Sequence, residues 1–169
     1  MSRLRAGSFV IIATLFAGGC ASTGATPRPF PTPGPAAVRV PPGAPGRDTG
    51  YEIAGTALHL RGTPYRNGGA DPAGFDCSGF VSYVFAQNGL AVPRTVTEQY
   101  HQGRQVDPQQ LQAGDLVFFS TVAPGASHVG IAIGGDEFLH APSSAGEVRV
   151  ERLSAAYWST RFVGARRIL

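Results

Sequence analysis

The 169-residue sequence contains no lysine, and all fourteen basic residues are arginine. No acid precedes Asp48, so residues 1–47 carry five arginines alone, while residues 48–169 carry nine arginines and all eleven acids. The formal charge of +3 therefore comes from the N-terminal part of the chain. A cationic face for nucleic acid is not implied for the remainder, and we expect no nucleic-acid partner. The C-terminal Arg161, Arg166 and Arg167 are interpreted as surface charges.

The sequence also lacks an apolar run of the roughly 20 residues that span a bilayer. A ten-residue run at 8–17 follows a short basic start and precedes small residues, which is typical of a secretory signal. Its end, Ala17-Gly18-Gly19-Cys20, resembles the lipobox of bacterial lipoproteins. We interpret residues 1–19 as a lipoprotein signal peptide and Cys20 as the lipidated residue, whose acyl chains would anchor the protein to a membrane. A plain signal peptide cut before Ala21 is the alternative.

Residues 20–47 are interpreted as the lipidated Cys and a proline-rich linker. Eight prolines occur here, at positions 27, 29, 31, 33, 35, 41, 42 and 45. Alternating prolines form neither a helix nor a central strand, so an extended, semi-rigid spacer is expected. A proline-rich ligand for a partner domain is the alternative. The remaining residues, 48–169, are predicted to form one catalytic domain.

Periodicity predicts helices first and strands afterwards in that domain. Helices are expected near 50–60, at 77–87 ending at Asn88-Gly89, and from a capping box at Thr95 to His101. Strands are expected at 115–120, 128–133, 137–140, 148–152 and 162–168, with a hairpin at Gly134-Gly135. This order indicates an α+β fold with an antiparallel sheet.

The chain has two cysteines, and the leader accounts for Cys20. Cys77 lies at a predicted helix start, where the helix dipole favours thiolate and lowers a thiol pKa, although the neighbouring Asp76 opposes this. His128 begins a strand whose small residues on the same side leave room for a neighbouring helix end. His140 ends the next strand, and the hairpin brings the two histidines together. These residues suit a Cys–His nucleophilic site with a second polar group orienting the base.

Several simpler interpretations stay open at this point. Cys77 can be a buried structural thiol, a disulfide partner of Cys20, or a zinc ligand with His128 and His140, although these lack the paired spacing of a zinc site. Asp76 can act as a helix cap alone. Tyr65 and His140 can be packing residues.

The sequence resembles the NlpC/P60 family, in its lipoprotein branch, from about residue 51 to residue 169. The motifs that carry the resemblance stand in the family's order and are Tyr65-Arg66-Asn67-Gly68-Gly69, Phe75-Asp76-Cys77-Ser78-Gly79-Phe80-Val81, Pro93-Arg94, Gly114-Asp115-Leu116-Val117-Phe118-Phe119, Ser127-His128-Val129-Gly130-Ile131, Phe138-Leu139-His140-Ala141 and the ending from Tyr157-Trp158 to Arg167.

The resemblance implies a papain-like α+β fold, with N-terminal helices packed on an antiparallel sheet, and a thiol peptidase acting on peptidoglycan. It makes Cys77 the nucleophile, His128 the base and His140 the residue that orients His128. No metal and no organic cofactor are expected.

The resemblance also implies a substrate site around the nucleophile. Tyr65 matches a tyrosine near the oxyanion, where a phenol helps to hold negative charge. Asp76 and Ser78 match positions that bind the acyl-side stem peptide, and we expect Asp76 to receive a cationic substrate amine.

The expected function is a monomeric cell-envelope endopeptidase that hydrolyses amide bonds in peptidoglycan stem peptides or crosslinks. It would be lipid-anchored and face the periplasm. Ala21 is not the Asp that suggests inner-membrane retention, which favours the outer membrane. A non-catalytic lipoprotein that tethers peptidoglycan is the alternative, and transfer in place of hydrolysis is a third interpretation. The scissile bond and any regulatory proteins are not specified by the sequence.

Overall fold

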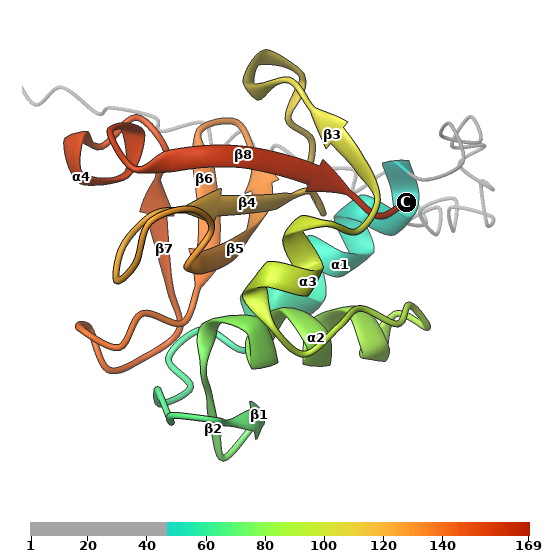
Figure 1. The fold of residues 1–169 in the computed structure, drawn as a ribbon. Helices are drawn as coiled ribbons and strands as arrows, with labels where there is room; N and C mark the ends of the chain where they lie inside the picture. The colour runs from blue at the N-terminus through green and yellow to red at the C-terminus, as the bar shows by residue number, and fades with distance from the viewer. Residues whose placement is uncertain (1–46) are drawn as a thin grey trace, which may run out of the picture. The chain divides into compact units, whose positions relative to one another are not determined.

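The computed structural model describes residues 47–169, which form a six-stranded antiparallel sheet with helices against it (Figure 1). The predicted signal peptide, Cys20 and the spacer lie outside these residues. The strands run in the order β3-β8-β4-β5-β6-β7, and a separate two-stranded hairpin, β1-β2, precedes the second helix. No helix within residues 47–169 is long and apolar enough to cross a membrane.

The helices are α1 (Arg47–His59), α2 (Cys77–Gln87), α3 (Val96–Tyr100) and α4 (Ala156–Ser159), with one 3₁₀ turn at Pro108–Gln110. The strands are β1 (Ala70–Asp71), β2 (Gly74–Phe75), β3 (Arg104–Val106), β4 (Leu116–Phe119), β5 (His128–Gly134), β6 (Glu137–His140), β7 (Arg149–Arg152) and β8 (Phe162–Arg167).

Local capping rules account for α2 and α3, and the sequence predicts both of these helices as well as α1. Asp76 is the N-cap of α2, and its side chain accepts a hydrogen bond from the Gly79 N–H. The helix ends at Asn88, and Gly89 follows with a positive φ of 74°. The Thr95 side chain caps α3 by accepting from the Glu98 N–H.

The five predicted strands are confirmed to within one residue at most ends, and the β5–β6 hairpin turns at two glycines with positive φ. β3, the β1-β2 hairpin and α4 are not predicted by the sequence patterns. These elements are two to four residues long. Such short segments carry too few residues for a hydrophobic period, and pairing or packing with distant parts of the chain decides them.

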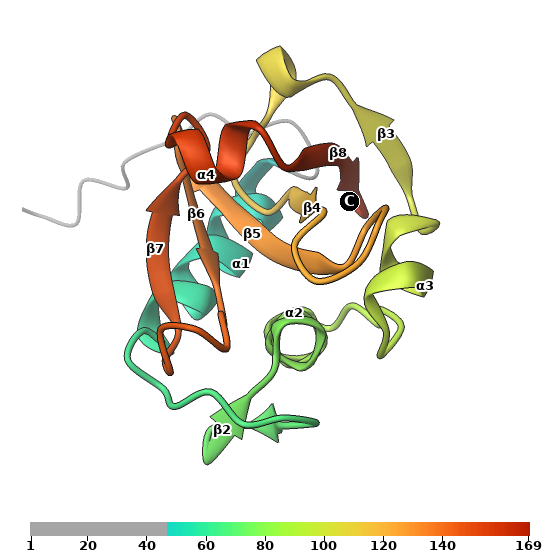
Figure 2. The ribbon, with the colours of Figure 1, turned by 60° about the vertical axis from the view of Figure 1, so that its left-hand side comes forward.

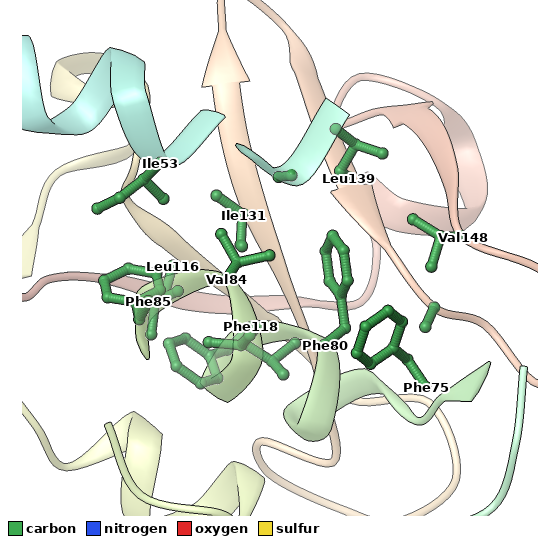
Figure 3. Packing of buried hydrophobic residues seen from close by; sticks show 14 residues of the cluster. Ile53, Phe75, Phe80, Val84, Phe85, Leu116, Phe118, Ile131, Leu139 and Val148 are labelled. Carbon is green, nitrogen blue, oxygen red and sulfur yellow. The ribbon is translucent and has the colours of Figure 1, made fainter. Parts of the chain in front are cut away.

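The main core lies between the sheet and the first two helices (Figure 3). Ile53 of α1 and Phe80, Val84 and Phe85 of α2 are fully buried there. The strands contribute Leu116, Phe118, Val129, Ile131 and Leu139, which are also fully buried. Figure 2 shows α2 nearly end-on beside β5, so this packing sets the start of α2 against the sheet.

A second cluster covers the opposite face of the sheet, where Phe119, Phe138 and Trp158 pack together. The small residues beside His128 were expected to leave room for a neighbouring helix end. Trp158 of α4 does pack on this face, in one cluster with Ala132. Gly130 has a different neighbour, because a Cβ there would lie 2.7 Å from Phe138 Cδ2, 2.8 Å from the Leu139 carbonyl oxygen and 3.2 Å from the His140 Cβ. Gly130 instead allows β6 and His140 to approach β5.

A buried ion pair links β8 to the segment just before β4. Arg167 Nε and Nη2 each donate to one Asp115 carboxylate oxygen at 2.6 Å. The side chains are only 13% and 1% exposed, and the Gln112 N–H also donates to Asp115 at 2.8 Å. The interpretation of Arg167 as a surface charge is therefore wrong, because the strand pairing carries its guanidinium onto a buried carboxylate.

Candidate active site

The start of α2 places Cys77 in a cavity of about 220 Å³. His128, at the start of β5, and Tyr65, from the segment before β1, line the same cavity. The remaining walls come from the loop after β4 and from the segment after β6, together with Tyr157 of α4. The fold thus brings together three predicted site residues that are up to 63 positions apart in the sequence.

His128 and His140 are in direct contact, with His128 Nε2 lying 2.7 Å from His140 Nδ1. His140 is fully buried and His128 is 8% exposed. One of the two nitrogens must donate and the other accept, since a hydrogen bond of this length needs a single proton between them. The contact occupies Nε2 of His128 and leaves Nδ1 as its second ring nitrogen. The predicted proximity of the two histidines is confirmed.

Aromatic side chains enclose the histidine pair. The Trp158 ring stacks on His128, with centroids 5.7 Å apart and planes 23° from parallel, and it meets His140 edge-on at 4.8 Å. Burial among these rings lowers the pKa of His128 to about 4. Burial, with further contributions from His128 and Arg149, lowers the pKa of His140 to about 2. Both rings are therefore neutral near pH 7.

The Cys77 thiol is partly buried, and burial followed by the negative charge of Asp76 raises its pKa. Backbone N–H groups of Ser78 and Val129 act in the opposite direction but are outweighed. The expectation that the helix start lowers this pKa is therefore wrong for the free protein. The pKa of Tyr65 is raised as well, first by burial and then by the charges of Cys77 and Asp76. Its phenol therefore keeps its proton and stays a hydrogen-bond donor.

Asp76 meets an arginine that the site prediction did not include. Arg94 Nη2 donates to Asp76 Oδ2 at 2.6 Å, and Nη1 donates to Oδ1 at 3.0 Å. Burial would raise the pKa of Asp76, but the hydrogen bonds from Arg94 and from the Gly79 N–H outweigh it and hold the pKa below its usual value. Asp76 caps α2 but does not act as a cap alone, because it also pairs with Arg94, and its contact with substrate stays a prediction.

Ser78 lies in the same cluster and is 6% exposed. Its hydroxyl accepts from Arg94 Nη1 at 2.8 Å and lies 3.4 Å from Asp76 Oδ1. The Pro-Arg motif at residues 93–94 was the only sequence signal for Arg94. Its pairing with Asp76 depends on the loop after α2 folding back beside the start of that helix.

The arrangement provides the groups that acyl transfer requires. A thiol, a neutral imidazole whose Nδ1 has no hydrogen-bond partner among residues 47–169, and a phenol line one cavity, and a second imidazole is hydrogen-bonded to the first. A nucleophile, a base and an orienting group in this order are the features of covalent catalysis on a carbonyl carbon.

The sequence model of the NlpC/P60 family matches residues 62–167 of this chain. Murein DD-endopeptidase MepH of Escherichia coli (strain K12) is 42% identical over 113 residues, covering 64% of this chain and 42% of MepH. Murein DD-endopeptidase MepS/Murein LD-carboxypeptidase of the same strain is 42% identical over 110 residues, covering 64% of this chain and 57% of that protein.

Among solved structures, an NlpC/P60 family protein from Bacillus cereus ATCC 10987 is similar with a TM-score of 0.66 and 33% identity. The match covers 71% of this chain and 40% of that one. This chain spans about half the length of the curated relatives it matches. The expected α+β fold is confirmed, and the matched segment contains Tyr65, Cys77, His128 and His140. This chain belongs to the NlpC/P60 family.

Proposed function

We propose that this protein is a cell-envelope cysteine endopeptidase that hydrolyses amide bonds in peptidoglycan stem peptides or crosslinks. The observation that carries the proposal is the convergence of Cys77 and His128 on one cavity, with His140 hydrogen-bonded to Nε2 of His128. The names of MepH and MepS, which are murein endopeptidases, support the choice of peptidoglycan as substrate.

In the proposed reaction, Cys77 is the nucleophile and His128 is the base. Sγ attacks the scissile carbonyl carbon while its proton passes to His128 Nδ1. The tetrahedral intermediate then collapses, the C–N bond breaks, and His128 returns the proton to the leaving amine. Water adds to the resulting thioester, again with His128 as base, and its breakdown releases the acyl product and the thiol.

His140 acts as the orienting residue in this scheme. For Nδ1 of His128 to accept the thiol proton, Nε2 must carry a hydrogen and donate it to His140 Nδ1. The pKa of His140 is lowered to about 2, mainly by burial, so its ring stays neutral. The lone pair on its Nδ1 therefore stays available to accept the hydrogen bond. The same hydrogen bond then stabilises the imidazolium that forms on His128.

The oxyanion and the acyl side of the substrate are assigned to residues around the start of α2. The Tyr65 phenol, a donor on the cavity wall, would hydrogen-bond the developing oxyanion. Asp76 and Ser78 flank the nucleophile and would position the acyl-side stem peptide. No step needs a metal or an organic cofactor.

The location proposed for the enzyme depends on the N-terminal residues. We propose that residues 1–19 are a lipoprotein signal peptide, that Cys20 is acylated, and that residues 20–47 space the catalytic domain, 48–169, from a membrane. The domain would face the periplasm as a monomer, with the outer membrane favoured. Labelling with a palmitate analogue, lost in Cys20→Ala, tests the anchor.

The test of the reaction is mass spectrometry of muropeptides released from purified sacculi. Cys77→Ala and His128→Ala are each expected to lower the rate about 10³-fold or more, because the thiol and its base act as one unit. His59→Ala, at an exposed histidine on α1, is the matched control and should retain activity. Wild-type activity in Cys77→Ala would refute the proposal, and sacculus binding without turnover would favour a tethering role.

A further inference from the structure

Both oxygens of the Asp76 carboxylate, adjacent to the proposed nucleophile, already accept hydrogen bonds within the protein. Arg94 donates to both of its oxygens, at 2.6 and 3.0 Å, in a bidentate pair. Oδ1 also accepts from the Gly79 N–H at 2.7 Å, and the Ser78 hydroxyl lies 3.4 Å away. A substrate amine that reached this carboxylate would have to share it with the guanidinium of Arg94.

Arg94 is also the more exposed partner of this ion pair. The Arg94 side chain is 42% exposed, whereas that of Asp76 is 16% exposed. A ligand that approaches this cluster therefore meets more of the cationic side chain than of the anionic one. An ammonium group would be repelled by Arg94, while an uncharged amide would not be.

Arg94 is held in place by a buried hydrogen-bond network and is not a freely moving surface arginine. The carbonyl of the preceding Pro93 accepts from Gln99 Nε2 at 2.7 Å and from the Ser82 hydroxyl at 2.9 Å. Gln99, which is fully buried, also donates to the Ser78 carbonyl at 3.1 Å. This network ties the segment that carries Arg94 to α2, so the pairing with Asp76 follows from the packing.

We propose that Arg94 determines acyl-side specificity by occupying Asp76, so that the site accepts stem peptides whose amino end is acylated and disfavours a free amine. The bond cleaved would then lie inside a longer peptide, in a stem still joined to its glycan or in a crosslink. This inference rests on the proposed peptidase activity, and it replaces the expectation that Asp76 receives a cationic amine.

The test uses matched peptides in which the acyl-side strand is cut back to two residues. One pair contains the D-glutamyl–diaminopimelate bond and the other the D,D crosslink bond. Within each pair, one peptide has a free terminal amine and the other is N-acetylated. The quantity measured is the ratio of kcat/KM for the acetylated peptide to that for the free amine, which a general loss of folded enzyme does not change. Wild type is expected to give a ratio above one.

Substitutions at Arg94 and Asp76 test whether this ion pair causes the preference for acetylated peptides. Arg94→Gln removes the cation and leaves Asp76 open, so the ratio should fall on the order of fivefold, the size expected for an exposed charge pair. Arg94→Lys keeps a cation beside Asp76 and should retain a ratio near that of wild type. Asp76→Asn keeps a capping side chain. In the double variant Arg94→Gln/Asp76→Asn the ratio should return toward that of wild type.

The outcomes separate this inference from the proposed function. Wild-type preference for the free-amine peptides would overturn the inference and leave the peptidase proposal standing, as would an unchanged ratio in Arg94→Gln. Failure of wild type to cleave any peptide or sacculus would refute the peptidase proposal. If Arg94→Gln does not fold, wild type and Arg94→Lys still decide, since both keep a cation beside Asp76 and a ratio below one in either protein would contradict the claim.

Discussion

The buried histidine pair is expected to make the folded protein sensitive to mild acid. The pKa of His128 is lowered by burial from 6.5 to about 4. Between pH 4 and pH 6.5, His128 is therefore mostly protonated in the unfolded chain and mostly neutral in the folded protein. Stability from this group is fully present above pH 6.5 and is lost as the pH falls toward 4. At pH 5 the loss is about 2 kcal/mol relative to pH 7, and it approaches about 3 kcal/mol below pH 4. His140, whose pKa is also lowered by burial, acts in the same direction.

Urea unfolding at pH 7 and pH 5 measures this loss. His128→Gln removes one titrating ring but keeps an amide that can donate to His140. It should lose about 2 kcal/mol less than wild type between the two pH values, because the carboxylates contribute equally to both proteins. Val129→Ala, at the neighbouring fully buried position, is the control and should lower stability equally at both. Equal acid losses in wild type and His128→Gln would refute the reasoning.

Two further predictions concern other charged groups. Arg167→Ala leaves the buried Asp115 carboxylate without its cation, so the free energy of unfolding should fall by about 3–5 kcal/mol in urea, and a loss below about 1 kcal/mol would contradict the buried pair. Alkylation of Cys77 by iodoacetamide, followed by peptide mass spectrometry, should rise with pH to a midpoint above the ordinary 9.0, because burial and then Asp76 raise the thiol pKa. Asp76→Asn should move that midpoint to lower pH. An unchanged midpoint would show that the Asp76 charge does not raise the pKa of the Cys77 thiol.

Much of the fold could be predicted from local rules. The N-cap at Asp76, the glycine after α2, the capping threonine before α3 and the alternating strands each depend on residues close together in the sequence. The same rules place Cys77 at a helix start and each histidine at a strand end. Motif order then sufficed to predict the family, which the comparisons confirm.

The short elements escaped prediction for a physical reason. β3 forms because Arg104, Gln105 and Val106 pair with β8, about 60 residues later in the chain. α4 has no capping side chain, and its buried Trp158 packs on Phe119 and Phe138 of the sheet. Neither segment carries a signal of its own, because distant partners supply the stabilising contacts.

The sequence by itself determined which residues could carry the chemistry and on which elements they would lie. Tertiary structure alone decided their charge state and their partners. Burial of Cys77 outweighs the helix start, and the loop after α2 sets Arg94 on Asp76. Strand pairing buries Asp115 against Arg167 and joins His128 to His140. Local sequence specifies backbone conformation, but desolvation and pairing of charges depend on which distant groups the packed chain brings within a few ångströms.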